Sequence, residues 1–365
     1  MKAVKLIILS LTMLSMASCS TEIQRAIMKN FEQKPTKEFF KVFHFVHEKE
    51  YELNSEEGIK RYKNFKANIK IIKETNAKNL SYTLGVNKFA DMTVEEFKQK
   101  FLQNPEAKKK DMMNTIRNLR EEGFFDKFAD EDDEKLFDHN EERATVGAFT
   151  PIDWTSSFGS PRDQGACGSC WTFAATGVLE SYRNRKNANI GSYLSTQQLV
   201  DCDTSNNGCN GGDFYYAFTY IKNNGIVDES SYKYKAAVGT CSIPSTAART
   251  KISRFSFCSN YWSYTTYQCT EDKSYATLTK GPSAVGIDGS AIMFYESGIF
   301  SDACSEDNHA VIMVGYGIEN GVEFYKIRNS WSSSWGENGY IRIARNKSNV
   351  NSCYVTNESY TVTLA

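Results

Sequence analysis

Residues 164–171 read Gln-Gly-Ala-Cys-Gly-Ser-Cys-Trp and stand where a glycine-rich loop enters an apolar segment, which predicts a helix beginning at Cys170. Two cysteines at this spacing are compatible with half of a zinc site, a redox pair, or a disulfide cysteine beside a nucleophile. Cys202 and Cys209 are too far apart for a second zinc half, the histidines do not cluster, and no strand–helix–strand unit precedes the loop. A helix N-terminus favours a thiolate, so the third interpretation fits best and makes Cys170 the candidate nucleophile.

The number of cysteines points to the same chemistry. Of ten cysteines, Cys19 lies near the N-terminus and the other nine lie between Cys167 and Cys353. Four disulfides would use eight of these nine, so one thiol remains outside them in an exported chain. A leftover thiol of this kind is a candidate nucleophile.

The N-terminus has the layout of a secretory signal. Lys2 and Lys5 precede the apolar run 6–14, and small residues follow. The run is shorter than the roughly 20 residues that a membrane span requires. We therefore expect residues 1–19 to be a cleaved signal peptide, in preference to a buried helix or a lipid anchor at Cys19, and we expect no membrane span. Export to a lysosome, an acidic vacuole or the extracellular space is implied.

Length and charge limit the other function classes. The chain has 365 residues, 41% of them hydrophobic, which suffices for two domains with buried cores. The formal net charge is −1 and the longest basic run is 108–110, so no nucleic-acid partner is predicted. No metal or organic cofactor is expected, and the chain is expected to be a monomer.

The two halves of the chain differ in character. Apolar residues recur three and four apart over 36–79, with Ile59 in the apolar stripe, and predict a helical domain. Acidic residues crowd 121–142 and predict a solvated linker. Glycine, tyrosine and turn signals prevail after residue 150. The elements expected there are helices near 170–179, 197–200 and 214–222 and strands near 310–315 and 324–327, which make an α+β domain.

Residues 167–171 match the Cys-Gly-Ser/Ala-Cys-Trp/Tyr signature of papain-like cysteine peptidases, in which a histidine and an asparagine follow about 130 to 150 residues later. His309 follows Cys170 by 139 residues and Asn329 follows it by 159. Further blocks resemble the family in the same order, among them 198–202, 209–212 and 335–340. The chain thus resembles the papain family over most of its length.

The N-terminal helices resemble the pro-segments of cathepsin L-type members. The matching positions are Glu57, Arg61, Phe65, Asn68, Ile72 and Asn76, followed by Gly85, Asn87, Phe89 and Asp91. The resemblance implies an α+β, papain-like two-lobed fold, with a mostly helical left lobe and a β-barrel-like right lobe, preceded by a small α-helical inhibitory prodomain. The implied segments are a helical inhibitory propeptide at 20–104, an acidic linker removed on activation at 105–149, and the peptidase domain at 150–365.

The implied activity is that of a cysteine endopeptidase made as a zymogen, which hydrolyses proteins or peptides through a thioester on Cys170 and is inhibited by its own propeptide. His309 would shuttle the proton, Asn329 would orient the histidine, and Trp331 would shield their hydrogen bond. The Gln164 side chain and the Cys170 N–H would stabilise the oxyanion. The alternatives are a catalytically inactive papain-like binding protein, which would normally lack one of the three catalytic residues, and a peptide ligase on the same fold.

The resemblance also implies a substrate pocket. An acid at Glu358 can pair with arginine at the pocket floor, so apolar, aromatic and arginine side chains are expected to bind. The alternative is a rim carboxylate in water, worth about 0 to 1 kcal/mol as an ion pair. A glycan on the sequon at Asn357 would crowd this pocket, and further sequons begin at Asn79 and Asn346. The implied substrate-binding positions are Gly211, Gly212, Asp213, Phe214, Asn308, Trp331 and Glu358.

Eight cysteines allow 105 pairings, so spacing alone does not give the disulfides. The pairs that the resemblance implies are Cys167–Cys209, Cys202–Cys241 and Cys304–Cys353, which leaves Cys258–Cys269 as the expected fourth.

Three features depart from the family pattern. Ser332 stands where relatives usually carry glycine, and since glycine alone tolerates positive φ freely, a small backbone shift is expected there. Thr196 stands where relatives often carry glutamate. The stretch between Asp91 and Pro151 is longer and more acidic than usual. It suggests a switch in which acidification protonates linker and propeptide carboxylates and allows cleavage within about 143–150.

Overall fold

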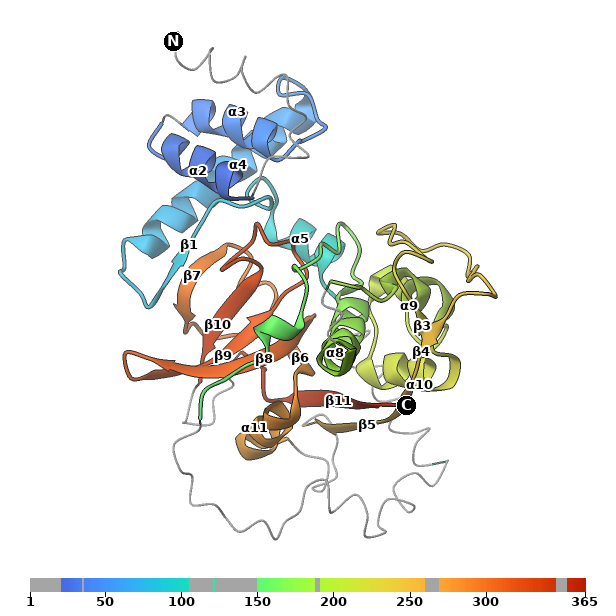
Figure 1. Ribbon diagram of the computed structural model, residues 1–365. Helices are drawn as coiled ribbons and strands as arrows, with labels where there is room; N and C mark the ends of the chain where they lie inside the picture. The colour runs from blue at the N-terminus through green and yellow to red at the C-terminus, as the bar shows by residue number, and fades with distance from the viewer. Residues whose placement is uncertain are drawn as a thin grey trace.

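The computed structural model describes residues 21–34, 36–104, 121, 150–187, 191–259, 269–345 and 353–365. The expected signal peptide, the linker apart from Glu121, and the sequon at Asn346 lie outside the described residues. Figure 1 shows a helical N-terminal unit against a body in which helices and a sheet flank the long helix α8 (Cys170–Asn187). None of the described helices is long and apolar enough to cross a membrane.

The N-terminal unit is built on α2 (Thr21–Phe31), α3 (Thr36–Val46) and α4 (Glu56–Asn76). Phe39, Phe40 and Phe43 share one face of α3 because they are spaced one, three and four apart, and all three rings contact Phe65 of α4 with centroids 4.8–5.4 Å apart. This aromatic cluster is the centre of the prodomain core.

The helical domain expected over 36–79 is confirmed, and its two apolar stripes belong to two separate helices, α3 and α4. The chain turns between α3 and α4, where Glu48 adopts a positive φ of 46°. Ser55 then caps α4, because its side chain accepts a 3.1 Å hydrogen bond from the Gly58 N–H. Ile59 is 63% exposed, so its assignment to the apolar stripe is wrong.

Side chains of α4 hold the segment that leads from the prodomain to the cleft. Asn68 donates to the carbonyls of Ala90 and Met92 at 2.9 and 2.8 Å, and Arg61 forms two 2.6 Å hydrogen bonds to Glu96. Glu96 lies in α5 (Val94–Phe101), while β1 (Tyr82–Leu84) pairs with β7 (Tyr295–Phe300) of the body. The prodomain is therefore joined to the body by both a strand and a helix.

A nine-stranded sheet forms the β-rich lobe, in the order β1-β7-β10-β9-β8-β6-β11-β5, with β2 (Ile152–Asp153) paired to β8. The first nine residues of β8 are buried, as is typical of a strand covered on both faces. The remaining strands are β5 (Ile252–Ser259), β6 (Ser283–Ile287), β8 (His309–Glu319), β9 (Val322–Arg328), β10 (Tyr340–Ala344) and β11 (Glu358–Leu364).

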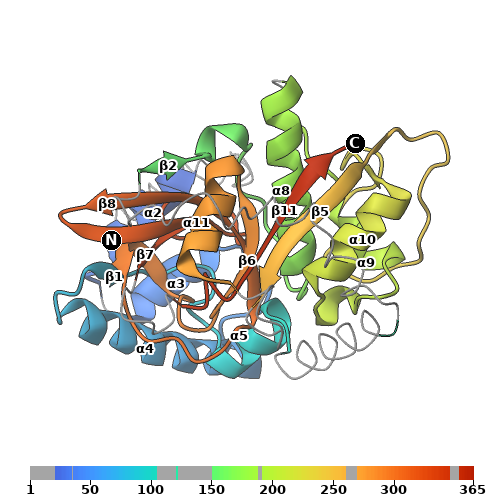
Figure 2. The ribbon, with the colours of Figure 1, turned by 90° about the horizontal axis from the view of Figure 1, so that it is seen from below.

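The second lobe packs around α8, which is buried along its first twelve residues and lies between the sheet and the helices α9 (Thr196–Cys202) and α10 (Phe214–Asn224) (Figure 2). A helix that is buried on all sides in this way belongs in the middle of a fold. The predicted α+β, two-lobed architecture behind a helical prodomain is confirmed. The smaller elements are η2 (Thr155–Ser157), η3 (Gly208–Asn210), β3 (Ile226–Val227), β4 (Arg249–Thr250) and α11 (Glu271–Lys280).

Candidate active site

Cys170 is the first residue of α8 and is fully buried. Among the described cysteines it is the one that forms no disulfide. Its Sγ accepts hydrogen bonds from the Ala310 N–H at 3.4 Å and from the Gln103 side-chain amide at 3.3 Å. The positive end of the helix dipole and these two donors all favour a thiolate at this position.

His309 and Asn329 come from neighbouring strands, because His309 begins β8 and Asn329 directly follows β9, its antiparallel partner. His309 Nε2 lies 2.7 Å from Asn329 Oδ1, which also accepts a 2.7 Å hydrogen bond from the Ser330 N–H. The Asn329 Oδ1 atom can only accept hydrogen bonds, so His309 Nε2 must be the donor and must carry the imidazole proton. Nδ1, buried without a hydrogen-bond partner among the described residues, keeps its lone pair.

Trp331 covers the imidazole. The two rings stack with centroids 4.5 Å apart, and the propeptide residues Phe89 and Phe97 pack edge-on against Trp331 at 5.4 and 5.2 Å. Burial lowers the pKa of His309 to about 4, and the hydrogen bond to Asn329 only partly offsets this. With the propeptide bound, the imidazole is therefore neutral at pH 7.

Gln164 presents a side-chain amide at the same place. Its Nε2 donates to the carbonyls of Phe101 and Cys167 at 2.8 and 2.9 Å, and its Oε1 accepts a 2.7 Å hydrogen bond from the Ser330 hydroxyl. Ser330 thus fixes the amide with its N–H groups towards the cleft. The sequence analysis missed this role, for which the one available signal was the position of Ser330 beside Asn329.

The propeptide occupies the cleft next to these groups. The Phe101 carbonyl accepts from Gln164, and the Gln103 backbone N–H donates to the Asn308 carbonyl at 2.9 Å. The Gln103 side chain then reaches Cys170. Sequence reasoning placed the end of the propeptide at residue 104 but did not single out these contacts, because no motif marks them.

Three glycines border the propeptide segment. A Cβ at Gly168 would lie 2.9 Å from the Leu102 carbonyl oxygen, and one at Gly289 would lie 2.5 Å from the Leu102 side chain. A Cβ at Gly211, which has a φ of 119°, would lie 3.2 Å from Gln103. Only a residue without a side chain lets a peptide backbone approach this closely.

The expected pocket residues lie between α10 and β11. Asp213 is the N-cap of α10 and accepts a 2.7 Å hydrogen bond from the Tyr215 N–H, and Phe214 packs on Tyr360 at 5.4 Å. Glu358 is 1% exposed, so the alternative of a rim carboxylate in water is wrong. Burial, helped by the negative charges of Asp213 and Glu358, raises the pKa of Tyr360.

Asn308 contributes to the cleft through its backbone. Its side-chain Oδ1 accepts from the Gly289 N–H at 2.8 Å, and its Nδ2 donates to Ser290 and Glu306 at 3.0 and 2.8 Å. Gly212 packs closely on α8, since a Cβ there would come 2.6 Å from the Trp171 ring. The Asn308 side chain therefore holds a neighbouring loop and leaves its carbonyl for a bound peptide.

Four disulfides fix the loops around the site, and they are the pairs expected from the sequence. The bridge from Cys167 to Cys209 ties the loop before Cys170 to the Gly211 wall. No group of His, Cys, Asp or Glu that could hold a metal ion occurs in the described part of the chain. The four pairs are Cys167–Cys209, Cys202–Cys241, Cys258–Cys269 and Cys304–Cys353.

Two positions depart from the residues usual in the family, Ser332 and Thr196. Ser332 adopts a φ of 75°, so it keeps the left-handed conformation that glycine reaches more readily. Thr196 brings no carboxylate, and the carboxylates that pair with Arg162 are Glu180 at 2.9 Å and Glu229 at 3.4 Å. The partly buried arginine is thus neutralised from two other positions.

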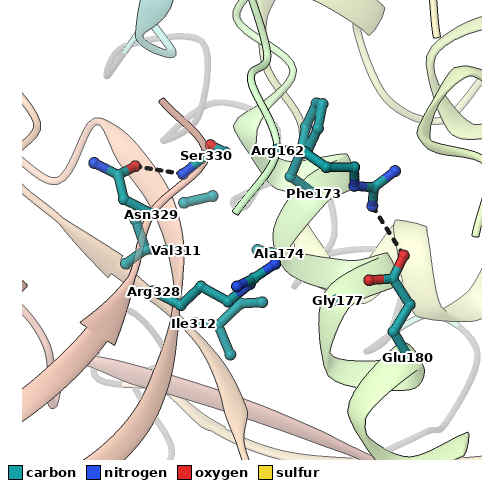
Figure 3. Close-up of a pocket in the computed structure, with 11 residues that line it drawn as sticks. Arg162, Phe173, Ala174, Gly177, Glu180, Val311, Ile312, Arg328, Asn329 and Ser330 are labelled. Atoms are coloured by element: carbon teal, nitrogen blue, oxygen red, sulfur yellow. Dashed lines mark hydrogen bonds and ion pairs between the residues drawn. The ribbon is translucent and has the colours of Figure 1, made fainter. Parts of the chain in front are cut away.

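A cavity of about 20 Å³ lies between α8 and β8, with Glu180 on the helix side and Asn329 and Ser330 on the sheet side (Figure 3). Arg162 and Arg328 also line it. Such a volume has room for about one water molecule, so this cavity is too small to be the place of a peptide substrate.

Comparisons with known proteins agree with this geometry. Residues 150–363 match the family model for papain family cysteine proteases, and residues 40–97 match that for the cathepsin propeptide inhibitor domain. Cysteine proteinase RD21A of Arabidopsis thaliana is 37% identical over 296 residues, which are 79% of this chain and 57% of that protein. The chain thus spans just over half the length of this plant relative and of the similar RD21B.

Other relatives match over most of both chains. A cathepsin L-like proteinase of Fasciola hepatica is 36% identical over 318 residues, 84% of this chain and 87% of that protein. The solved digestive procathepsin L 3 of Tenebrio molitor has a TM-score of 0.71 at 29% identity, over 91% of this chain and 100% of that one. The recombinant stem bromelain precursor has a TM-score of 0.72 at 30% identity, over 91% and 99%. The chain therefore belongs to the papain family of cysteine proteases and carries a cathepsin-type inhibitory propeptide domain.

Proposed function

We propose that this chain is the zymogen of a cysteine endopeptidase with Cys170 as nucleophile, His309 as base and acid, and Asn329 as the residue that orients the histidine. The observation that carries the proposal is the 2.7 Å contact between His309 and Asn329 beside a thiol at the start of α8. It leaves Nδ1 as the basic nitrogen of the ring.

The reaction follows from these positions. His309 Nδ1 takes the thiol proton, the Cys170 sulfur adds to the scissile carbonyl, and the C–N bond breaks as the proton passes to the leaving amine. Water then adds to the thioester, His309 takes its proton, and the C–S bond breaks to release the acid and restore the thiol. The Gln164 amide and the Cys170 N–H donate to the oxyanion in both steps.

The propeptide is proposed to inhibit by holding these same groups. It places the Phe101 carbonyl on the Gln164 amide, the Gln103 amide on the Cys170 sulfur, and two phenylalanines over Trp331. Activation requires removal of residues up to the start of the peptidase domain near residue 150, through the linker 105–149.

The substrate pocket is proposed to lie at Asp213, Phe214 and Glu358, with Gly211 and Gly212 along the backbone of the substrate. The buried carboxylate of Glu358 beside aromatic rings suits either an aromatic side chain or an arginine whose charge it neutralises. Asn308 and Trp331 would line the opposite wall.

The proposed destination is an exported one, a lysosome, an acidic vacuole or the extracellular space. Four disulfides support it, because disulfides form and persist along the secretory route. The proposed partners are protein or peptide substrates and the chain's own propeptide, with the enzyme acting as a monomer.

The test is acid activation of the full chain followed by hydrolysis of a fluorogenic Phe-Arg peptide, with Cys170→Ala and a thiol-directed epoxide as controls. Activity that is lost in the variant and with the epoxide is expected. A correctly processed but inert wild type would favour the binding-protein alternative. Analysis of products in the presence of excess peptide amine would reveal a ligase, which would form a new amide instead of an acid.

A further inference from the structure

The geometry points to Tyr234 as a positioning residue that holds both donors of the oxyanion hole, an inference that rests on the function proposed above. Its hydroxyl donates a 2.6 Å hydrogen bond to the Gln164 carbonyl and lies 2.5 Å from the Ser169 hydroxyl. A phenol has one proton, so Ser169 donates in the second contact. The Tyr234 hydroxyl thus joins Gln164, which supplies the side-chain donor, to Ser169. Ser169 directly precedes Cys170, whose N–H is the backbone donor.

The loop that carries these donors needs such a tie. Glycines at 165 and 168 give it backbone freedom, and Gly165 adopts a φ of 58°. The N–H groups of Gln164 and Gly168 are held by the carbonyls of Ser330 and Cys209, both at 2.9 Å. The contact from Tyr234 fixes the other side of Gln164, its carbonyl, and so sets the direction from which its side chain leaves the backbone.

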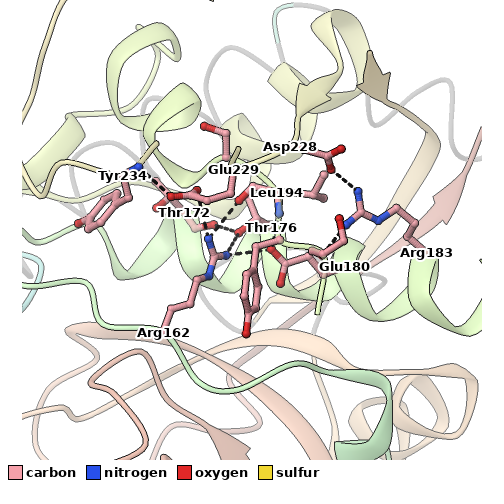
Figure 4. A network of polar contacts seen from close by, with 12 residues as sticks. Arg162, Thr172, Thr176, Glu180, Arg183, Leu194, Asp228, Glu229 and Tyr234 are labelled. Carbon is pink, nitrogen blue, oxygen red and sulfur yellow. Dashed lines mark hydrogen bonds and ion pairs between the residues drawn. The ribbon is translucent and has the colours of Figure 1, made fainter. Parts of the chain in front are cut away.

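Tyr234 is itself held firmly to α8. Its ring packs edge-on against Phe173 at 5.0 Å, and its backbone N–H donates to Glu229 at 2.7 Å. Glu229 pairs with Arg162, whose guanidinium lies 5.0 Å from the Phe173 ring and also pairs with Glu180. Figure 4 shows this polar network over α8, with the Tyr234 backbone bonded to the Glu229 carboxylate.

The protonation state of the hydroxyl suits this role. Burial raises the pKa of Tyr234, so the group remains a donor throughout the working pH range. Rigid support matters because oxyanion donors act only when they are held within about 0.5 Å of the productive geometry. Complete loss of one donor costs roughly 10²- to 10³-fold in rate.

Tyr234→Phe is therefore expected to lower kcat for peptide hydrolysis about tenfold while KM changes less than about twofold, since the donors are loosened but still present. Alkylation of Cys170 by iodoacetamide forms no oxyanion and depends on the thiolate. Its rate and its pH profile are therefore expected to stay at the wild-type values in Tyr234→Phe.

The experiment uses the processed enzyme and a matched control. Tyr232 lies in the same segment, but its hydroxyl bonds to Asp201 at 2.7 Å and does not touch the loop. Tyr232→Phe is expected to keep both kcat and the alkylation rate. Ser169→Ala removes the other half of the bridge and replaces Tyr234→Phe if that variant does not fold, with the same expected split between hydrolysis and alkylation.

Equal losses in hydrolysis and alkylation, or a kcat within twofold of wild type, would overturn the inference. Gln164→Ala separates this result from failure of the proposed function. If Gln164→Ala retains full kcat, the oxyanion-hole assignment itself fails, whereas a loss in Gln164→Ala without one in Tyr234→Phe removes only the positioning role. The double variant should lose less than the product of the two single losses, and strictly multiplicative losses would count against Tyr234 acting through Gln164.

Discussion

The side-chain amide of Gln103 donates a 3.3 Å hydrogen bond to the sulfur of Cys170, so the propeptide contacts the proposed nucleophile directly. The contact is buried, and an amide donor there is compatible with either a thiol or a thiolate. A carboxylate at the same place would face the sulfur with like charge and would cost free energy in a site with little water.

Gln103→Glu is therefore expected to open the zymogen at neutral pH. Cys170 in the intact zymogen should react with iodoacetamide at least about tenfold faster than in wild type, because the free energy that holds the propeptide in the cleft falls by roughly 1.4 kcal/mol or more. Asn104→Asp adds the same charge at an exposed neighbour and serves as control. Equal alkylation rates for Gln103→Glu and wild type would show that the contact contributes nothing to inhibition.

Ser332 predicts an order of stabilities among its variants. With its φ of 75°, a β-branched side chain clashes with the backbone, whereas glycine fits without strain. Ser332→Gly should be at least as stable as wild type, and Ser332→Val should lose about 2 kcal/mol of unfolding free energy. Chemical denaturation of the Cys170→Ala zymogen measures both. A Val variant as stable as the Gly variant would contradict the assigned backbone conformation.

Glu358 predicts the specificity of the pocket. Replacing it with alanine leaves a bound arginine without a buried counter-charge, which typically costs 2 kcal/mol or more, so the Arg-to-Phe ratio of kcat/KM should fall at least about tenfold. Glu358→Gln keeps the shape and should lower the same ratio, while activity on the Phe substrate changes little in either variant. An unchanged ratio in Glu358→Ala would remove Glu358 from the pocket.

The fold and the candidate residues could be predicted from the sequence because short motifs and their spacing along the chain indicate both. The loop before Cys170 is a contiguous signature, and the spacing to His309 and Asn329 needs no knowledge of the structure.

The errors and omissions have physical causes. Apolar periodicity runs on through 36–79 because α3 and α4 each bury a stripe, and nothing in it marks the positive φ of Glu48. Ile59 keeps the spacing but lies on the outer face of α4. The contact of Tyr234 with Gln164 joins residues 70 apart in the chain, so only the tertiary structure reveals it.

His47 predicts how the prodomain responds to acid. Its ring packs against Phe43 at 4.9 Å, and its Nε2 is buried without a hydrogen-bond partner among the described residues. Burial, with help from Lys49 and Lys88, lowers its pKa to about 3. In the unfolded prodomain this histidine has a pKa near 6.5. Below pH 6.5 the unfolded state is therefore protonated at His47, whereas the folded state stays neutral there. This contribution to stability is complete above pH 6.5 and falls by about 1.4 kcal/mol per pH unit as the pH drops towards 3.

At pH 5 this single histidine should therefore destabilise the folded prodomain by about 2 kcal/mol. His47→Gln removes the titration and should slow zymogen activation at pH 5 about tenfold or more. His44→Gln is the matched control, since His44 lies on the same helix and bonds through Nε2 to the Tyr51 carbonyl at 2.6 Å. If His47→Gln activated at the wild-type rate at pH 5, the acid response would have to come from the carboxylates alone.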